Sequence, residues 1–325
     1  MNFFGPPEVA ANAAGLGEKK AALTFGKLLM LGILAGAYIG FGANLATVIG
    51  CDVAKFLGNG VGQLIFGGVF SVGLMLVVIG GSELFTGNNM FMTISALDGR
   101  IGWGSVLSNW VIVWIANFIG SLLLVYILVA GFYGAGADGA AKDFWFAGAV
   151  GSKALLIAKG KLGLTWSAAF ARAILCNWLV CMAVWLALAS KDVVGKVFGI
   201  FFPIMAFVAS GFEHSVANMF FIPMGLEISQ IPALVDVAAK SVLTPDQLVL
   251  LTSGQALPVD AVAAMDAFKA SVASLFTWKN FLLNNLVPVT LGNIVGGGFF
   301  VATFYWFSYL KKDAPAASEK ESAKA

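Results

Sequence analysis

The feature that most constrains this chain is a series of long apolar segments. A helix needs about 20 consecutive, mostly apolar residues to cross the hydrocarbon core of a bilayer. Segments of that length occur six times, at residues 27–50, 62–85, 105–132, 166–190, 196–226 and 283–310. Charged residues make up only 11% of the chain, against roughly 25% in soluble domains. The sequence therefore predicts an all-α integral membrane protein with six transmembrane helices.

The regions around the spans have a different composition. Residues 1–26 are Ala-rich and lack the basic-then-apolar order of a cleaved signal, so we expect an N-terminal surface helix. Residues 27–310 form the transmembrane domain. It contains an extramembrane insert at about 227–280, with helix signals at Thr244-Pro245-Asp246 and over 258–276. Residues 311–325 are small and charged, which predicts a disordered tail.

Charge and cysteine content exclude several classes of function. The net charge is only +2 and the lysines are scattered, so nucleic acid is not an expected partner. Cys51, Cys176 and Cys181 form no C-x-x-C motif, so we expect neither a disulfide nor a metal site. Lys and Arg near the span ends slightly favour the side that carries the termini, which predicts cytoplasmic termini. The insert would then lie on the opposite side.

Two polar motifs recur in the two halves of the chain. The first ends the second span and interrupts the fifth, as Gly81-x-Glu83-x4-Asn88 and Gly211-x-Glu213-x4-Asn218. The second lies in the third and sixth spans, as Asn109-x7-Asn117-x2-Gly120 and Asn285-x7-Asn293-x2-Gly296. The motifs keep their order at equivalent spans, which indicates a duplicated three-span unit. Because three is odd, the two units insert with opposite topology, as inverted repeats.

The first motif predicts that the second and fifth helices are broken within the bilayer. A break exposes backbone groups that must be satisfied by protein or by water in a cavity. We expect the breaks to be supported by four polar side chains, Glu83, Asn88, Glu213 and Asn218. The two glutamates are expected to accept hydrogen bonds from the freed backbone N–H groups. The alternative is a functional role, since a carboxyl group inside a membrane is a functional candidate by default.

Thr86 and His214 lie directly beside the two breaks. Thr86 sits where a half-helix restarts, so it is either a simple N-cap or a hydroxyl that also faces a pore. His214, the only histidine, is either a hydrogen-bonded core residue or a group that exchanges a proton near neutral pH. One histidine excludes paired haem ligands and a His-rich metal site. No cofactor and no catalytic activity are expected. Arg172, in the fourth span, is expected to snorkel to one face or to meet an acid.

Four stretches resemble the formate/nitrite transporter family, which includes formate, nitrite and hydrosulfide channels. They are GSELFTGN (81–88), ILCNWLVCMAVW (174–185), ASGFEHSVANMF (209–220) and PVTLGNIVGGG (288–298). The similarity extends from about Lys27 to Leu310. It implies an aquaporin-like protomer with broken helices 2 and 5, assembled as a homopentamer in the inner (plasma) membrane. Each protomer would conduct small anions through its own pore across the lipid bilayer.

The resemblance also implies roles for individual residues. Thr86 and His214 match the family's central pair, and Asn177 matches the asparagine beside that histidine. Lys161 matches the lysine that makes the outer vestibule attractive to anions, although here no histidine lies near it and neighbouring Lys159 is an alternative. The positions that match the family's pore constrictions are Phe70, Leu74, Leu84, Phe85, Val180 and Phe207.

The predicted substrate is formate, because the longer C-terminal match is closer to the formate branch. Nitrite is the alternative, favoured by FTGNNMF and ILCNWLVC, and hydrosulfide follows. Proton donation by His214 would give proton-linked or pH-gated permeation. Two hypotheses from other classes of protein stay open. One is a neutral-solute channel of the aquaporin type, whose Asn-Pro-Ala motifs are absent from the sequence. The other is a membrane subunit of a redox enzyme.

Overall fold

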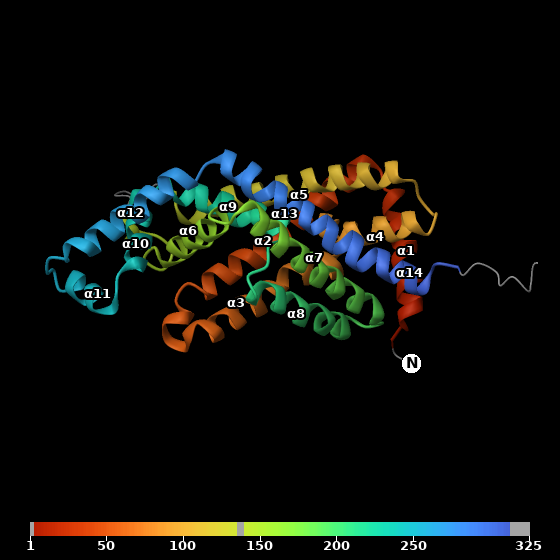
Figure 1. The fold of residues 1–325 in the computed structure, drawn as a ribbon, viewed down its shortest axis with the longest axis horizontal. Coiled ribbons are helices and arrows are strands. Elements are labelled where there is room, and N and C mark those ends of the chain that lie inside the picture. Colours follow the sequence, from red (N-terminus) through yellow and green to blue (C-terminus); the bar gives the residue numbers. More distant parts are fainter. Residues whose placement is uncertain (1–2, 135–139, 313–325) are drawn as a thin grey trace, which may run out of the picture.

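The computed structural model describes residues 3–134 and 140–312, and these ranges are almost entirely helical (Figure 1). Five helical stretches are singly long and apolar enough to cross a membrane. They are α2 (Phe25–Ile49), α3 (Val53–Gly80), α5 (Trp103–Phe132), α7 (Trp166–Ala189) and the C-terminal stretch Asn280–Tyr309. A bent pair, Ser215–Ile228 with Pro232–Val242 at 106°, raises the number to as many as six. The predicted tail lies outside the described residues from residue 313 onwards.

Both predicted helix breaks are present. Helix α3 ends at Gly80 and the chain resumes as α4 (Phe85–Leu97), so the second predicted span stops short of residue 85. The fifth predicted span is divided into α8 (Val193–Ala209) and α9 (Ser215–Ile228). Gly81 and Gly211 take left-handed φ values of 78° and 71°, a conformation that glycine adopts without the steric cost of a Cβ. These two glycines let the chain turn between the half-helices.

Helix packing explains the remaining glycines of the second repeated motif. Helix α2 packs along α5, and α7 packs along α13 (Val287–Ile294). A Cβ at Gly120 would collide with the carbonyl oxygen of Ile33 on α2, and one at Gly296 with the carbonyl oxygen of Ile174 on α7. Small residues at these positions let the backbones approach closely, as in other membrane helix pairs. The two halves therefore repeat the same helix contact.

The last span is one helical stretch with two π-helical segments. The π-segments are Asn280–Leu286 and Val295–Thr303, which alternate with α13 and with α14 (Phe304–Tyr309). Insertions of this kind are frequent at functional sites and rotate the following side chains around the axis. The second π-segment begins two residues after Asn293, one of the repeated asparagines.

Three further groups of helices accompany the five long apolar stretches. Helix α1 (Pro6–Ala21) packs along α4 through a buried small-residue face at Val9, Ala10, Ala13 and Ala14. Helix α6 (Ala149–Leu162), which has no counterpart among the predicted helices, packs against α9. The insert forms α10 (Pro232–Ala239), α11 (Pro245–Thr252) and α12 (Val259–Leu275), and α11 is capped by Thr244 and Gln247. The insert and the N-terminus lie at opposite ends of the molecule (Figure 1).

Candidate functional site

Thr86 and His214, the two residues that the family resemblance implied to be central, contact each other inside the protein. Thr86 lies in the first turn of α4 and His214 is the N-cap of α9. Both side chains are buried, and the Thr86 Oγ1 lies 2.9 Å from the His214 Nε2. The other ring nitrogen, Nδ1, accepts a hydrogen bond from the Ala217 backbone N–H at 3.0 Å. Because Nδ1 accepts, Nε2 carries the proton in the neutral ring and donates it to Thr86.

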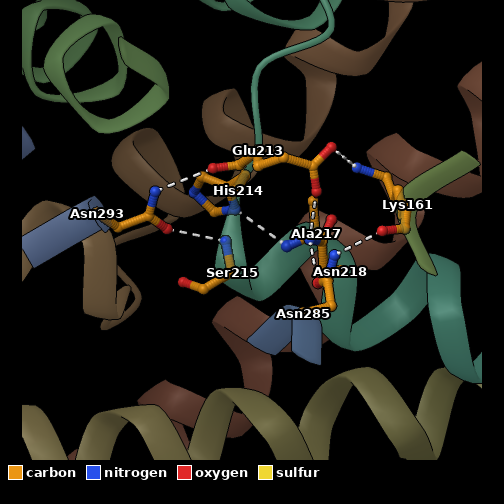
Figure 2. A network of polar contacts seen from close by, with 8 residues as sticks. All are labelled: Lys161, Glu213, His214, Ser215, Ala217, Asn218, Asn285 and Asn293. Carbon is orange, nitrogen blue, oxygen red and sulfur yellow. Dashed lines mark hydrogen bonds and ion pairs between the residues drawn. The ribbon is translucent and has the colours of Figure 1, made fainter. Parts of the chain in front are cut away.

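The backbone at the second break is secured by one asparagine. The Asn293 Oδ1 accepts from the Ser215 backbone N–H at 2.8 Å (Figure 2). Its Nδ2 donates to the carbonyl oxygens of Glu213 at 3.0 Å and of Ala173 at 2.8 Å. A carboxamide both donates and accepts, so a single side chain bridges the two sides of the break.

Asn117 does the same at the first break. Its Oδ1 accepts from the Phe85 backbone N–H at 2.9 Å. Its Nδ2 donates to the carbonyl oxygens of Glu83 at 2.9 Å and of Gly32 at 2.8 Å. Both bridging asparagines belong to the second repeated motif, which therefore serves the break created by the first motif.

The two glutamates have other partners, so the expectation that their carboxylates accept the freed backbone N–H groups was wrong. The Glu213 carboxylate accepts from the Asn218 Nδ2 at 2.7 Å and from the Lys161 Nζ at 2.9 Å (Figure 2). An ionised carboxylate only accepts and cannot bridge a freed N–H and a freed C=O together, whereas the asparagines can. The glutamates instead neutralise a lysine and orient the next asparagine.

Glu83 repeats this arrangement in the first half. Its carboxylate lies 2.6 Å from the Lys20 Nζ and 2.8 Å from the Asn88 Nδ2. Asn88 and Asn218 each also donate to a further asparagine, Asn109 at 2.9 Å and Asn285 at 2.8 Å. Each carboxylate is buried and is compensated by one ammonium group, as a charge away from water requires.

Asn177 holds the backbone of Thr86 rather than the histidine. Its Nδ2 lies 3.1 Å from the Thr86 carbonyl oxygen and 2.7 Å from the carbonyl oxygen of Asn293. The Cys181 thiol also donates to the Thr86 carbonyl oxygen, at 3.5 Å. Within the described ranges no hydrogen bond joins Asn177 to His214. Asn177 thus contacts the Thr86 member of the pair, whereas the resemblance implied a place beside His214.

A cavity of about 360 Å³ leads to His214 from the side of α6. Its polar lining includes Lys153, Lys161, Arg172, Glu213 and His214, and its aromatic lining includes Phe66, Phe70, Phe207, Phe212 and Phe221. Lys153 lies on α6, outside the spanning helices, and burial lowers the pKa of its ammonium group because desolvation disfavours the charged form. Lys159 does not line the cavity, and its Nζ lies 5.2 Å from the centre of the Phe268 ring.

The six predicted constriction residues are all buried, but they do not share one location. Phe70 and Phe207 line the cavity and pack edge to face, with ring centres 5.9 Å apart. The Phe207 ring lies 5.9 Å from the His214 ring. The remaining four, which do not line this cavity, are Leu74, Leu84, Phe85 and Val180. Their part in narrowing a pore stays a prediction.

The fold and this site define a membrane transport protein of two inverted three-span units with broken helices that meet at the centre. A family model described as "Formate/nitrite transporter" matches residues 7–307, and the chain belongs to this family. The family consists of channels and transporters, so the chain is not an enzyme.

Individual relatives agree with this assignment. A probable formate transporter of Methanothermobacter thermautotrophicus is 43% identical over 96% of this chain and 99% of its own length. The nitrite transporter NirC of Escherichia coli (strain K12) is 29% identical over 95% of this chain and 93% of its own length. A solved structure described as a pentameric formate channel with formate bound is 35% identical, with a TM-score of 0.64 over 88% of this chain and 98% of that one.

Proposed function

We propose that the protein is a homopentameric channel in the plasma membrane, with cytoplasmic termini, and that each protomer conducts formate. The observation that carries this proposal is the Thr86–His214 hydrogen bond, placed where two half-helices begin. Helix N-termini attract anions through their unpaired N–H groups and their dipole. Formate is the favoured anion because two relatives that match nearly the whole chain carry formate in their descriptions.

The physical problem for such a channel is moving a charge past phenylalanine rings. Formate is almost fully ionised at neutral pH, and an unpaired charge in an apolar constriction costs several kcal/mol. Because the His214 Nε2–H donates to the Thr86 Oγ1, the threonine hydroxyl is free to donate its own proton to an anion oxygen. The Thr86 hydroxyl proton moves to formate, the His214 Nε2 proton moves to Thr86, and the ring regains a proton from a hydronium ion that enters through the cavity lined by His214. Formate and this proton together leave as neutral formic acid, which crosses the apolar lining made by Phe70 and Phe207 at a lower cost than the ion.

The experiment that tests the substrate is anion competition in proteoliposomes. Formate, nitrite and hydrosulfide compete for uptake of labelled formate at two pH values. We expect formate to compete best and nitrite next. Nitrite is the second candidate, supported by its transporter among the relatives. Stronger competition by nitrite than by formate would reverse the assignment.

The proton step has its own test. A His214→Phe variant keeps an aromatic ring but has no proton to donate. We expect its formate flux to lose the pH dependence of the wild type between about pH 5 and pH 8. An unchanged profile would remove His214 from the mechanism.

The assembly and its orientation are tested separately. The 35% identical pentameric structure supports a homopentamer, and native mass spectrometry of the detergent-solubilised protein should give five times the 34.0 kDa chain mass. The opposite ends occupied by the insert and the N-terminus support an insert on the far side of the membrane (Figure 1). Membrane-impermeant labelling of cysteines placed in the insert should succeed from the outside of intact cells only.

A further inference from the structure

Lys161, the lysine expected to attract anions, already forms an ion pair with Glu213. The Lys161 Nζ lies 2.9 Å from a carboxylate oxygen of Glu213 and 5.5 Å from the centre of the Phe221 ring. The Lys161 side chain is 14% exposed and that of Glu213 is 5% exposed. Two opposite charges this close cancel much of each other's field beyond a few ångströms. The pair contributes little net attraction at the mouth of the cavity.

Two other cations line the same cavity and have no such partner. Among the described residues, no carboxylate lies within ion-pair distance of Arg172 or Lys153. Arg172 is an exposed residue of α7. The Lys153 Nζ lies 5.8 Å from the centre of the Phe66 ring, a contact that leaves its charge uncompensated.

The charge balance of the cavity follows from these partners. Three of its described lining side chains are cationic and one is acidic, so the lining carries a net charge of two positive units. The Lys161–Glu213 pair is neutral as a whole, so the two positive charges are those of Arg172 and Lys153. Low-dielectric walls focus such a field and raise the local concentration of anions. Desolvation lowers the pKa of Lys153, and a bound anion would offset that cost.

Arginine adds a geometric preference to this charge. Its planar guanidinium presents two parallel N–H donors that match a carboxylate, whereas an ammonium group acts as a point charge. Formate and nitrite are both bent, planar anions with two oxygens, and hydrosulfide is not.

We propose that Arg172, supported by Lys153, is the site that recruits two-oxygen anions into the cavity, in place of Lys161. This inference rests on the proposed function, since it names the residues that deliver the ion to the channel. The captured anion would lie in the same cavity as His214. Arg172 would thereby select formate and nitrite over hydrosulfide before the anion reaches the Thr86–His214 pair.

The first test measures formate influx into proteoliposomes for the wild type, Arg172→Gln, Lys153→Gln and Lys159→Gln. Lys159→Gln is the matched control, since it removes the same charge from α6 outside the cavity. We expect Arg172→Gln to raise the half-saturating formate concentration about threefold, the effect of one charge several ångströms away in water, with unchanged flux at saturation. The difference should vanish at about 1 M salt, where charges are screened within about 3 Å.

Arg172→Lys separates charge from geometry. It should keep the salt dependence of the wild type and lose part of the preference for formate over hydrosulfide. Equal half-saturating concentrations for Arg172→Gln and Lys159→Gln would overturn the proposal, and so would an Arg172→Lys variant with the full preference of the wild type.

The second test does not depend on transport. Crystals of the wild type grown with bromide should show an anomalous peak in contact with Arg172 or Lys153, which Arg172→Gln weakens and Lys159→Gln keeps. Absence of the peak in the wild type would overturn the proposal even if formate is carried. If the wild type carries no anion, the proposed function fails, and the bromide peak alone decides whether this cavity is an anion site. A peak without any effect on influx marks an adventitious ion only and also overturns the proposal.

Discussion

The two helix breaks are built from the same parts but differ at the residue that precedes each second half-helix. Each break has a left-handed glycine, a glutamate paired with a lysine, and an asparagine that bridges the backbone. Counted from the glutamate, Leu84 in the first half corresponds to His214 in the second, and Thr86 corresponds to Val216. The duplicated unit thus supplies the scaffold twice. Each half supplies only one member of the central hydrogen bond.

The N-cap shows what this difference does locally. His214 caps α9 by accepting from the Ala217 N–H at 3.0 Å, whereas Leu84 caps α4 without any side-chain hydrogen bond. The polar N-cap fixes the orientation of the imidazole. The apolar N-cap contributes no polar group, so in the first half the partner of the imidazole is Thr86, from the first turn of α4. The two halves therefore share the residues that hold the helix breaks, but they differ in the polar side chain that each contributes to the central hydrogen bond.

The largest predicted effect is the loss of a bridging asparagine. Asn293→Leu leaves two buried groups without a partner, the Ser215 N–H and the carbonyl oxygen of Glu213. The Ala173 carbonyl loses its contact with Asn293 but stays inside helix α7. At about 1–3 kcal/mol per orphaned group, we expect a loss on the order of 4 kcal/mol, measured as the unfolding free energy in detergent. Asn117→Leu should lose a similar amount if the two breaks are equivalent.

Asn284→Leu is the control for this prediction. Asn284 is exposed, and among the described residues its side chain bonds to Asn280 alone, so its replacement should change stability little. An Asn293→Leu variant that is as stable as this control would show that the bridging role is not needed.

The next largest effect comes from breaking the ion pairs. Lys161→Met leaves the buried Glu213 carboxylate unpaired and should cost roughly 3 kcal/mol in unfolding free energy. Lys20→Met should do the same to Glu83. Replacing both members, as in Lys161→Met with Glu213→Gln, removes the unpaired charge and should recover most of that loss. No recovery in the double variant would mean that packing of the lysine stem, and not its charge, supports the break.

A smaller effect is expected when the second break is made like the first. His214→Leu removes the cap of α9 and the partner of the Thr86 hydroxyl, which should cost about 1–2 kcal/mol in unfolding free energy. The pH dependence of formate flux should disappear in the same variant. Circular dichroism melts and liposome flux measured on one preparation separate the two losses, and a retained pH profile would contradict the assigned asymmetry.

Local patterns were enough to predict the spans and the breaks, because length, apolarity and inserted Gly-x-Glu signals are encoded within each segment. The central place of Thr86 and His214, which are 128 residues apart, was implied only by the family resemblance. Pairing between distant residues was not predictable in this way. Lys20 lies 63 residues from Glu83, and Lys161 lies 52 residues from Glu213, so helix packing decides which lysine meets which acid. The second motif carried a signal for the bridging asparagines, but their hydrogen-bond partners lie on other helices.

Two other features had weak or misleading signals in the sequence. Helix α6 is short and is interrupted by glycines and lysines in AVGSKALLIAKGKL, so it lacks the apolar length that identified the spans. Arg172 was expected to snorkel or to meet an acid. In the described part of the chain it has no acidic partner, and it is exposed and lines a cavity. A cavity shared by α6, α7 and the second break arises only from the tertiary packing.

The smallest change in structure tests the asymmetry most directly. Thr86→Val places in the first half the residue type that Val216 provides in the second. It keeps the side-chain shape but leaves the His214 Nε2–H without its acceptor. One lost hydrogen bond of about 1.4 kcal/mol in the barrier for permeation corresponds to about a tenfold lower formate flux. Thr86→Ser keeps the hydroxyl and should retain most of the flux.

Thr93→Val is the matched control on the same helix. Thr93 is buried, and its hydroxyl has no hydrogen-bond partner among the described residues. Removing that hydroxyl should leave stability unchanged or slightly higher, because an unsatisfied buried group is lost. Equal flux in Thr86→Val and Thr93→Val would mean that permeation does not need the Thr86 hydroxyl. The asymmetry between the halves would then reside in His214 alone.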